Sequence, residues 1–215
     1  MYFVANWKMF GNLRSLNTLN KVINFSKKIK KKKCKLIYCP PTTLICTLAK
    51  MLKKTRIEVG AQNCHESEKY GAFTGHINSK MLKDVGAKYI ILGHSENRKL
   101  GENDKLINLK IRSSIKSGLK VIFCVGETFN EKRKKITKKI LAKQISKGLD
   151  QIKNKKAVLI AYEPVWAIGT GLIPTDSDLF NIINFIKHKV KGSNVLYGGS
   201  VSSKNISSLK KINNI

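Results

Sequence analysis

Three side chains in this sequence have the properties that a proton transfer next to a carbonyl group requires. Glu163 directly follows an apolar run, residues 157–161, and precedes a short segment with two glycines. A carboxylate at a strand end is well placed to act as a general base, and a glycine-containing segment beside it can close as a lid. His94 and Lys8 also follow apolar runs. An imidazole can polarise a carbonyl group, and an ammonium group can stabilise the negative charge that develops.

Each of these residues also has a structural interpretation. A glutamate before a proline in a loop is more often structural than catalytic. A lysine at a strand end is usually solvated, and a single histidine carries little information by itself. Residue types alone therefore leave both interpretations open for Glu163, His94 and Lys8.

Strand and helix patterns alternate along the whole chain, which is typical of an α/β protein. Apolar runs rich in β-branched residues recur roughly every 32 residues, about the size of one β/α unit. Their starts lie near Tyr2, Cys34, Ile57, Lys88, Leu119, Ala157 and Asn194. No change in composition divides the chain, so we expect one domain, residues 1–215. A parallel (β/α)₈ barrel with seven units present fits best, and its active site would lie at the C-terminal ends of the strands.

Apolar residues at helical spacing predict which positions face the core. The expected faces are Leu16, Leu19, Val22, Ile23 and Ile29; Leu106, Leu109 and Ile115; Ile140, Leu141, Ile145, Leu149 and Ile152; and Leu179, Ile182, Ile183 and Ile186.

The segment 162–171, YEPVWAIGTG, resembles the catalytic-loop signature of the triosephosphate isomerase family. A single short motif would be weak, but further motifs similar to those of the family follow one another in the family's order over residues 2–215. They are ANWKM at 5–9, GAQN at 60–63 with GAFTG at 71–75, GHSE at 93–96, CVGE at 124–127 and YGGSV at 197–201. Such an ordered set is very specific.

The resemblance implies a TIM barrel that interconverts dihydroxyacetone phosphate and glyceraldehyde 3-phosphate, a step of glycolysis and gluconeogenesis. Glu163 would be the base and His94 the electrophile. To stay neutral, the imidazole would need a backbone donor or a helix N-terminus behind it, and the residues that would open such a turn are Ser95, Glu96, Asn97 and Arg98. Lys8 and Asn6 would bind the substrate and stabilise the enediolate. Glu96 would be either a proton-relay partner of Lys8 or a carboxylate at a helix start. The reaction uses side chains only, so we expect no metal and no organic cofactor.

A dianionic phosphate group needs several backbone N–H donors without bulky side chains in the way. The resemblance places such donors at Gly169 and at Ser200, after the Gly198-Gly199 turn. Gly198 and Gly199 either contribute to this site or serve only as a tight turn.

The resemblance also implies a mobile lid and a subunit contact. Thr74 resembles a residue that reaches into a neighbouring subunit, so a homodimer is implied. Pro174, in the second hinge of the lid, should stiffen that hinge, because its ring fixes φ. The lid comprises Pro164, Val165, Trp166, Ala167, Ile168, Gly169, Thr170 and Gly171.

Length and composition agree with a cytoplasmic enzyme. The chain has 215 residues, of which 42% are hydrophobic, enough for one substantial core. No apolar run approaches the ~20 residues that span a bilayer, and the N-terminus lacks the pattern of a signal peptide. The five cysteines show no metal-ligand spacing, so we expect buried free thiols. His65, His76 and His188 are expected on the surface or in loops.

The charge is unusual, because 42 Lys and Arg residues face 13 Asp and Glu residues, a net charge of +29. The densest basic runs are residues 27–33 and 132–139. Such runs could bind nucleic acid, but basic residues are spread over the whole chain and no RNA-binding motif accompanies them. A compositional bias on solvated helix faces is the favoured explanation, without a specific nucleic-acid partner. A positive field should also attract small anionic substrates.

The strand spacing places an eighth strand just beyond Ile215, so the eighth strand and helix of the barrel are missing from this sequence. We interpret the chain as a truncated copy or fragment of a longer protein, with a natural seven-stranded enzyme as the alternative. Two other functions stay open: an inactive, barrel-derived basic binding protein, and an isomerase for another small phosphosugar.

Overall fold

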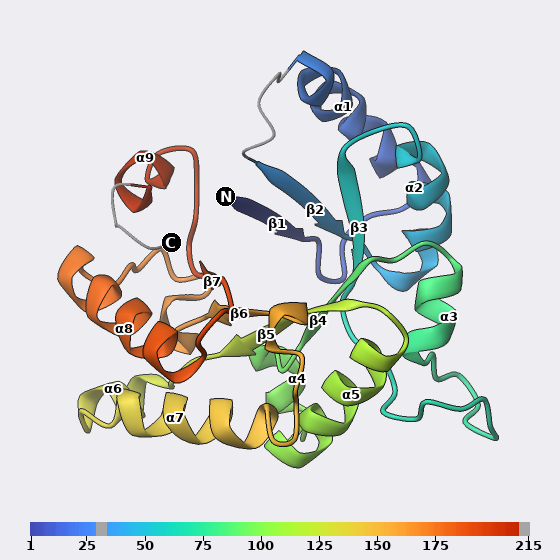
Figure 1. Cartoon of the computed structure of the whole chain (residues 1–215). Helices are drawn as coiled ribbons and strands as arrows, with labels where there is room; N and C mark the ends of the chain where they lie inside the picture. Colours follow the sequence, from blue (N-terminus) through green and yellow to red (C-terminus); the bar gives the residue numbers. More distant parts are fainter. Residues whose placement is uncertain (29–33, 211–215) are drawn as a thin grey trace. The chain divides into compact units, whose positions relative to one another are not determined.

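The computed structural model describes residues 1–28 and 34–210, in which seven parallel strands alternate with helices (Figure 1). In the sheet the strands follow one another in chain order. They are β1 (Tyr2–Asn6), β2 (Lys35–Cys39), β3 (Ile57–Ala61), β4 (Tyr89–Leu92), β5 (Lys120–Val125), β6 (Val158–Tyr162) and β7 (Val195–Tyr197). Each begins at the predicted position or one residue after it.

The helices between the strands include short 3₁₀ turns. The α-helices are α1 (Leu19–Lys28), α2 (Ile45–Leu52), α3 (Ser79–Asp84), α4 (Ser95–Lys99), α5 (Asp104–Lys116), α6 (Phe129–Arg133), α7 (Thr137–Gly148), α8 (Asp176–Lys189) and α9 (Ile206–Leu209). The 3₁₀ helices are η1 (Leu13–Thr18), η2 (Thr42–Leu44), η3 (Lys155–Ala157) and η4 (Val165–Ala167).

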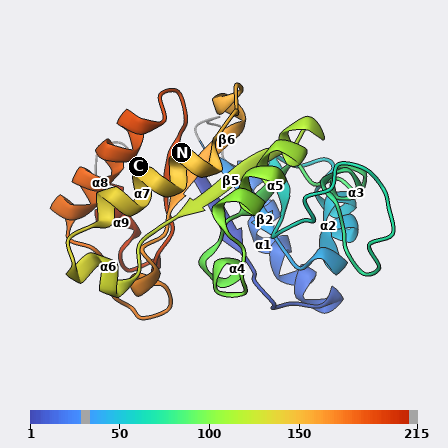
Figure 2. The same cartoon turned by 90° about the horizontal axis from the view of Figure 1, so that it is seen from below.

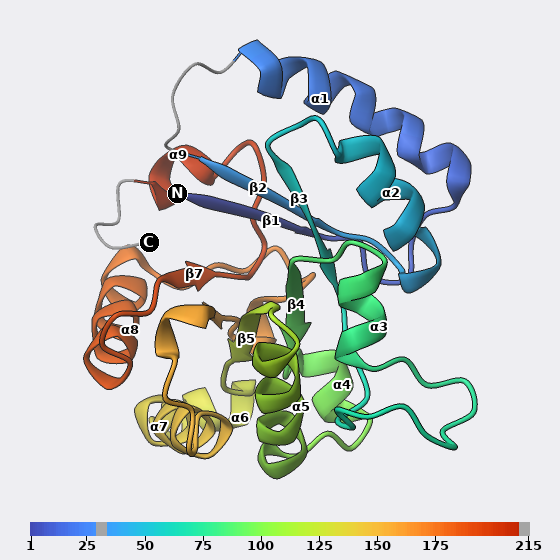
Figure 3. The same cartoon turned by 45° about the vertical axis from the view of Figure 1, so that its right-hand side comes forward.

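The chain divides into two compact units, and each is considered by itself. The first comprises residues 1–92 and 112–121, and the second comprises residues 93–111 and 122–215. In the first unit β1, β2 and β3 pair in register, with Phe3 opposite Leu36 and Leu36 opposite Ile57. The long connection between β3 and α3 extends as a loop away from α3 (Figures 1 and 3).

The second unit contains a strand, β6, that is buried along its whole length. All five residues of β6 are buried, as expected for a parallel strand covered on both faces. Helices α6, α7 and α8 lie side by side (Figures 1 and 2), and α7 contacts both of the others. The buried residues of α7 and α8 include Leu141, Ile145, Leu179, Ile183 and Ile186, as predicted.

The prediction for α5 was wrong. Leu109 is 40% exposed, whereas Ile107 and Ile111 are fully buried. The same face buries polar residues, among them Lys110, whose ammonium group pairs with the carboxylate of Glu102. Because the buried face contains polar residues, its apolar periodicity is weak, and the alternative face looks more hydrophobic in the sequence.

The expectation for the cysteines is met only in part. All five cysteines lie in the described residues and carry free thiols, but only Cys39, Cys64 and Cys124 are buried, and Cys34 is exposed. Of the basic run 27–33, residues 29–33 lie outside the described residues, and Ile29 with them. Among the described helices, none combines the length and apolarity that crossing a bilayer requires.

Candidate active site

Glu163 begins the connection that follows β6, and both its main chain and its side chain are held in place. Its backbone N–H donates to the carbonyl oxygen of Val125 at 2.8 Å. Its side chain is 15% exposed and lies over Gly198. A Cβ atom on Gly198 would approach Cγ of Glu163 to 2.7 Å and Oε1 to 2.9 Å. Glycine at this position therefore makes room for the carboxylate.

His94 follows β4 through Gly93 and forms the N-cap of α4. Its Nδ1 atom accepts the backbone N–H of Glu96 at 3.2 Å, so Nδ1 carries no proton and the N–H of the neutral ring lies at Nε2. The Nε2 atom lies 3.7 Å from Oε2 of Glu163. The backbone donor that a neutral histidine requires is therefore present at the predicted turn.

Glu96 is the most exposed of the predicted catalytic residues. Its carboxylate oxygen Oε2 lies 3.6 Å from Nδ1 of His94, a distance that would suit an ion pair with a protonated ring. The hydrogen bond from the Glu96 backbone N–H occupies Nδ1, however, and excludes a proton there. The backbone N–H of Glu96, and not its carboxylate, therefore fixes the ring of His94.

Arg98 ties the residues around His94 to the end of β5. Its Nε donates to the carbonyl oxygen of Gly93 at 2.7 Å, and its Nη2 donates to that of Cys124 at 3.4 Å. Its Nη1 donates to Oδ1 of Asp104 at 2.7 Å, where opposite charges strengthen the bond. The sequence indicates for Arg98 only a possible helix turn, because a single arginine after a motif carries no specific signal.

A buried carboxylate, Glu127, anchors the start of the lid. Its Oε1 accepts the indole N–H of Trp166 at 2.8 Å, and its carboxylate accepts the hydroxyl of Tyr162 at 3.2–3.3 Å. Lys132 lies over the Trp166 ring, 3.5 Å from its centroid. Burial raises the pKa of Glu127, and the hydrogen bonds from Trp166 and Tyr162, with the charge of Lys132, offset this only partly. The CVGE motif contains Glu127, but nothing in the motif by itself indicates this anchoring role.

The middle of the lid is attached to the segment after β7. The hydroxyl of Ser200 donates to the carbonyl oxygen of Ala167 at 2.7 Å and accepts the N–H of Gly171 at 3.2 Å. A further hydrogen bond lies within the lid, where the hydroxyl of Thr170 donates to the carbonyl oxygen of Trp166 at 3.0 Å. Ser200 therefore links both halves of the lid tip to one side chain.

The glycines of the lid and of the turn after β7, among which Gly169, Gly198 and Gly199 are predicted to bind phosphate, have structural reasons to be glycine. Gly169 has a φ of +70° and Gly171 a φ of +78°, which L-residues with side chains rarely adopt. A Cβ atom on Gly199 would lie 2.2 Å from the hydroxyl of Tyr197. Gly198 and Gly199 thus have packing reasons to be glycine, besides any contact with a phosphate group.

Asn6 and Lys8 lie in the first unit, at the end of β1. The backbone N–H of Lys8 donates to Oδ1 of Asn6 at 2.9 Å. Nε2 of Gln62 donates to the carbonyl oxygens of Lys8 and Cys39, both at 2.8 Å. Lys8 has a φ of +52°, which is uncommon for a residue with a side chain. Backbone strain of this kind clusters at functional sites, and Gln62, whose role the sequence patterns do not reveal, helps to hold it.

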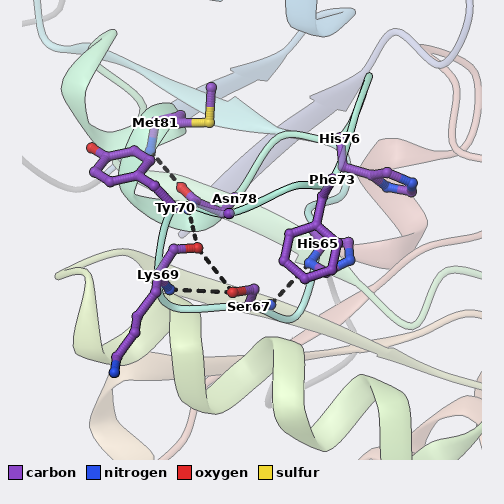
Figure 4. A pocket seen from close by; sticks show the side chains of 9 residues that line it. His65, Ser67, Lys69, Tyr70, Phe73, His76, Asn78 and Met81 are labelled. Atoms are coloured by element: carbon purple, nitrogen blue, oxygen red, sulfur yellow. Dashed lines mark hydrogen bonds between the residues drawn. The ribbon is translucent and has the colours of Figure 1, made fainter.

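The loop that carries Thr74 has internal structure of its own. The rings of Phe73 and His76 both contact the ring of His65, with centroids 4.4 Å and 4.9 Å away. Side chains from the same loop line a pocket (Figure 4), and Nδ2 of Asn78 donates to the carbonyl oxygen of Lys69 at 3.2 Å. The segment Gly71–His76 is exposed throughout, so Thr74 lies at an accessible loop tip.

The predicted residues thus fall into two groups. The second unit brings together Glu163, His94, the lid and Ser200, and the first unit holds Lys8, Asn6 and Thr74. Within residues 1–28 and 34–210, no group of three His, Cys, Asp or Glu side chains is arranged to hold a metal ion.

Comparisons with known proteins match the whole chain, or nearly all of it, to one family. The family model of triosephosphate isomerase matches residues 1–215. A triosephosphate isomerase of Thermodesulfovibrio yellowstonii is 42% identical over 224 residues, covering 100% of this chain and 90% of that protein. One of Wolbachia pipientis is 39% identical, covering 99% and 84% of the two chains.

A solved structure gives the same result. The crystal structure of triosephosphate isomerase from Bartonella henselae superposes with a TM-score of 0.88 at 31% sequence identity, covering 100% of this chain and 89% of that one. The seven parallel strands therefore belong to the TIM barrel fold, and the predicted fold class is confirmed.

Proposed function

We propose, from the premise that this chain belongs to the triosephosphate isomerase family, that Glu163 moves a proton between two adjacent carbons of a triose phosphate. The reaction interconverts dihydroxyacetone phosphate and glyceraldehyde 3-phosphate, the substrates of an intramolecular aldose–ketose isomerase. It is a step of glycolysis and gluconeogenesis.

The observation that carries the proposal is the pairing of His94 with Glu163. The carboxylate removes a proton from the carbon that bears the hydroxyl group, and the electron pair of that bond forms the carbon–carbon double bond of the enediolate. The N–H at Nε2 of His94, 3.7 Å from the carboxylate, donates to the oxygen on which negative charge develops. The proton of the hydroxyl group then moves to the former carbonyl oxygen, and Glu163 returns its proton to the neighbouring carbon, so that the carbonyl group forms at the carbon that first lost a proton. A glutamate base beside a neutral histidine is the arrangement already known from triosephosphate isomerases, and these two residues can adopt it.

The remaining residues bind the charged parts of the substrate. Lys8 would supply a positive charge and Asn6 an amide donor to the enediolate. The backbone N–H groups of Gly169 and Ser200 would bind the phosphate dianion, together with the Gly198-Gly199 turn. Support comes from the strained backbone at Lys8 and from the attachment of the lid to Ser200. Glu96 would take part only as a relay for protons to Lys8.

We also propose a homodimer, formed through the loop that carries Thr74. The loop tip is exposed, and two of its aromatic residues, Tyr70 and Phe73, are 70% and 47% exposed. Exposed aromatic side chains on a structured loop favour a protein contact. Sedimentation at micromolar concentration tests this point, and a monomer alone would contradict it.

We also propose that the enzyme is cytoplasmic. Free thiols on all five cysteines favour the cytoplasm, where thiols stay reduced. A single TIM-barrel domain over residues 1–215 is the domain organisation that the strand spacing supports. Exposed basic residues of α6, of α7 and of the connection between them would attract the anionic substrate. They are Arg133, Lys134, Lys135, Lys138, Lys139, Lys143 and Lys147. Specific binding to nucleic acid or membranes is not part of the proposed function.

The experiment compares the purified chain with Glu163→Gln in an assay that couples triose phosphate formation to a dehydrogenase. We expect isomerase activity in the chain and a loss of roughly three orders of magnitude or more in the variant, because general-base catalysis contributes about 10²–10⁴-fold. Equal activity in the two proteins would contradict the role of Glu163. Inactivity of the unsubstituted, folded chain would contradict the proposed function and revive the alternative of an inactive binding protein.

A further inference from the structure

A side chain of α7, Gln144, binds both polar backbone groups of Gly126. Its Oε1 accepts the N–H of Gly126 at 2.9 Å, and its Nε2 donates to the carbonyl oxygen of Gly126 at 3.1 Å. Gly126 directly follows β5, where the backbone leaves the sheet ladder. The side-chain amide thus provides one acceptor and one donor, the pair that an adjacent peptide group would provide. The residue is half-buried and has no place in the motifs that identify the family here.

Gly126 in turn contacts the main chain of the proposed base. A Cβ atom on Gly126 would lie 1.8 Å from the carbonyl oxygen of Glu163 and 3.3 Å from the nitrogen of Pro164. The residues on either side of Gly126 are bonded to the same segment. Val125 accepts the N–H of Glu163 at 2.8 Å, and Glu127 accepts the N–H of Val165 at 3.0 Å.

The backbone of Glu163 therefore packs on the segment Val125–Glu127, and Gln144 holds that segment through its two hydrogen bonds to Gly126. Because Gly126 has no side chain, its backbone packs directly on the backbone of Glu163. A shift of Gly126 is therefore passed on to Glu163. Any displacement would move the carboxylate relative to His94 and to the reacting carbon.

We propose that Gln144 is a positioning residue for Glu163, which acts through Gly126 without touching the substrate. The inference rests on the proposed function for its effect on the reaction, but its structural part stands on the contacts alone. Only an amide side chain fits both groups. A carboxylate would place an acceptor against the carbonyl oxygen of Gly126, and an apolar side chain would leave both backbone groups without these bonds.

The test compares Gln144→Met with a control of matched chemistry, Asn108→Leu. Asn108 also donates from its side-chain amide to two backbone carbonyls, those of Gly148 at 3.0 Å and Asp150 at 2.9 Å. These bonds lie at the C-terminal end of α7, in the same unit. Both substitutions replace an amide with an apolar side chain of similar size and remove two hydrogen bonds, so both should lower thermal stability.

We expect kcat of Gln144→Met to fall roughly 10- to 100-fold with little change in KM, because a misplacement of about 1 Å can cost 10²-fold. With substrate deuterated at the carbon that loses its proton, the isotope effect on kcat should rise, since proton transfer becomes slower. Asn108→Leu should keep both the kcat and the isotope effect of the unsubstituted chain. Equal losses in the two variants would reduce Gln144 to a structural role and overturn the proposal, as would an unchanged kcat in Gln144→Met.

A second variant and a second measurement keep the proposal open to refutation if Gln144→Met does not fold. Gln144→Glu keeps the length of the side chain and one acceptor, and should show a lowered kcat; full activity in this variant would overturn the proposal. Amide hydrogen exchange needs no activity. The N–H groups of Glu163 and Val165 should exchange faster in the variant, whereas that of Ile160, bonded to Asn194, should not change. Unchanged exchange of the Glu163 N–H would overturn the positioning role of Gln144. Inactivity of the unsubstituted chain would overturn only the proposed function.

Discussion

Nε2 of His94 lies 3.7 Å from Oε2 of Glu163, while Nδ1 of the same ring accepts a backbone N–H. The two nitrogens of His94 therefore have opposite roles. One is fixed as an acceptor by the start of α4, which leaves the other as the donor beside the carboxylate. A neutral imidazole with its proton on Nε2 can stabilise an oxyanion by donating that N–H in a hydrogen bond.

The protonation of His94 can be observed directly. We expect ¹⁵N NMR of the chain at neutral pH to show an unprotonated Nδ1 and a protonated Nε2 for this residue. His94→Gln, which cannot present the same donor, should lower kcat by roughly 10²–10³-fold, the scale on which loss of one oxyanion donor acts. A signal from a doubly protonated ring would contradict the account.

The contact of Gly198 with Glu163 predicts a second variant. In Gly198→Ala the new Cβ atom would lie 2.7 Å from Cγ of Glu163, so the carboxylate must move. We expect kcat to fall by about 10²-fold, with a smaller change in KM. A rise in KM at constant kcat would instead assign Gly198 to the phosphate site, and steady-state kinetics on both substrates distinguish the two results.

Ser200 links the two halves of the lid tip, so the loss of its hydroxyl should destabilise the closed lid. Ser200→Ala removes two hydrogen bonds, to Ala167 and Gly171, each worth about 1 kcal/mol. We expect kcat/KM to fall roughly 10-fold. Ser193→Ala is the control, because its hydroxyl donates to the carbonyl oxygen of Lys155 at 2.9 Å, and neither residue belongs to the lid. Similar losses in both variants would count against a role in the lid.

The buried carboxylate of Glu127 predicts a pH dependence of stability. Because burial raises its pKa, the folded chain keeps the proton at a pH where the unfolded chain has lost it. The contribution of Glu127 to the free energy of unfolding is therefore fully present below the unfolded pKa and declines as the pH rises through the folded pKa. Glu127→Gln does not titrate.

Urea unfolding of both proteins at pH 4 and pH 7 measures this difference, because the other titrating groups are common to both. The unsubstituted chain should lose stability relative to Glu127→Gln between the two pH values. A difference that stays constant, or that changes in the opposite direction, would contradict a raised pKa of Glu127.

The cysteines should differ in reactivity. Burial raises the pKa of the Cys39 thiol to about 12, so it stays protonated at neutral pH, and its side chain is fully buried. Cys34 is exposed. Treatment of the folded chain with iodoacetamide, followed by mass spectrometry, should find Cys34 alkylated and Cys39 unmodified, since the thiolate is the reactive form. Alkylation of both at equal rates would contradict the buried position of Cys39.

The sequence was sufficient to predict the strands and the placement of Glu163 and His94 at strand ends, because both leave local signals. Strands buried on two faces give continuous apolar runs, and such a run locates β6 to within one residue. Glu163 follows directly on β6, His94 follows β4 after Gly93, and the four residues after His94 predict the turn behind it.

The supporting contacts could not be predicted in the same way. Gln144, Arg98 and Gln62 act through backbone groups that are 18, 26 and 54 residues away in the chain. No local pattern encodes such a partner, and an amide or guanidinium group on a helix or in a loop is usually solvated. The face of α5 was mispredicted for a related reason, because a buried ion pair at Lys110 and Glu102 replaces apolar residues there.

The most direct test of the central claim is the fate of the proton that Glu163 is proposed to transfer. Isomerisation of dihydroxyacetone phosphate in D₂O, followed by proton NMR, reports whether deuterium enters the product at the carbon that receives the proton. We predict incorporation with the unsubstituted chain, because the carboxylate can exchange its proton with solvent before returning it, and none above background with Glu163→Gln. Incorporation at the same rate in the two proteins would contradict the account.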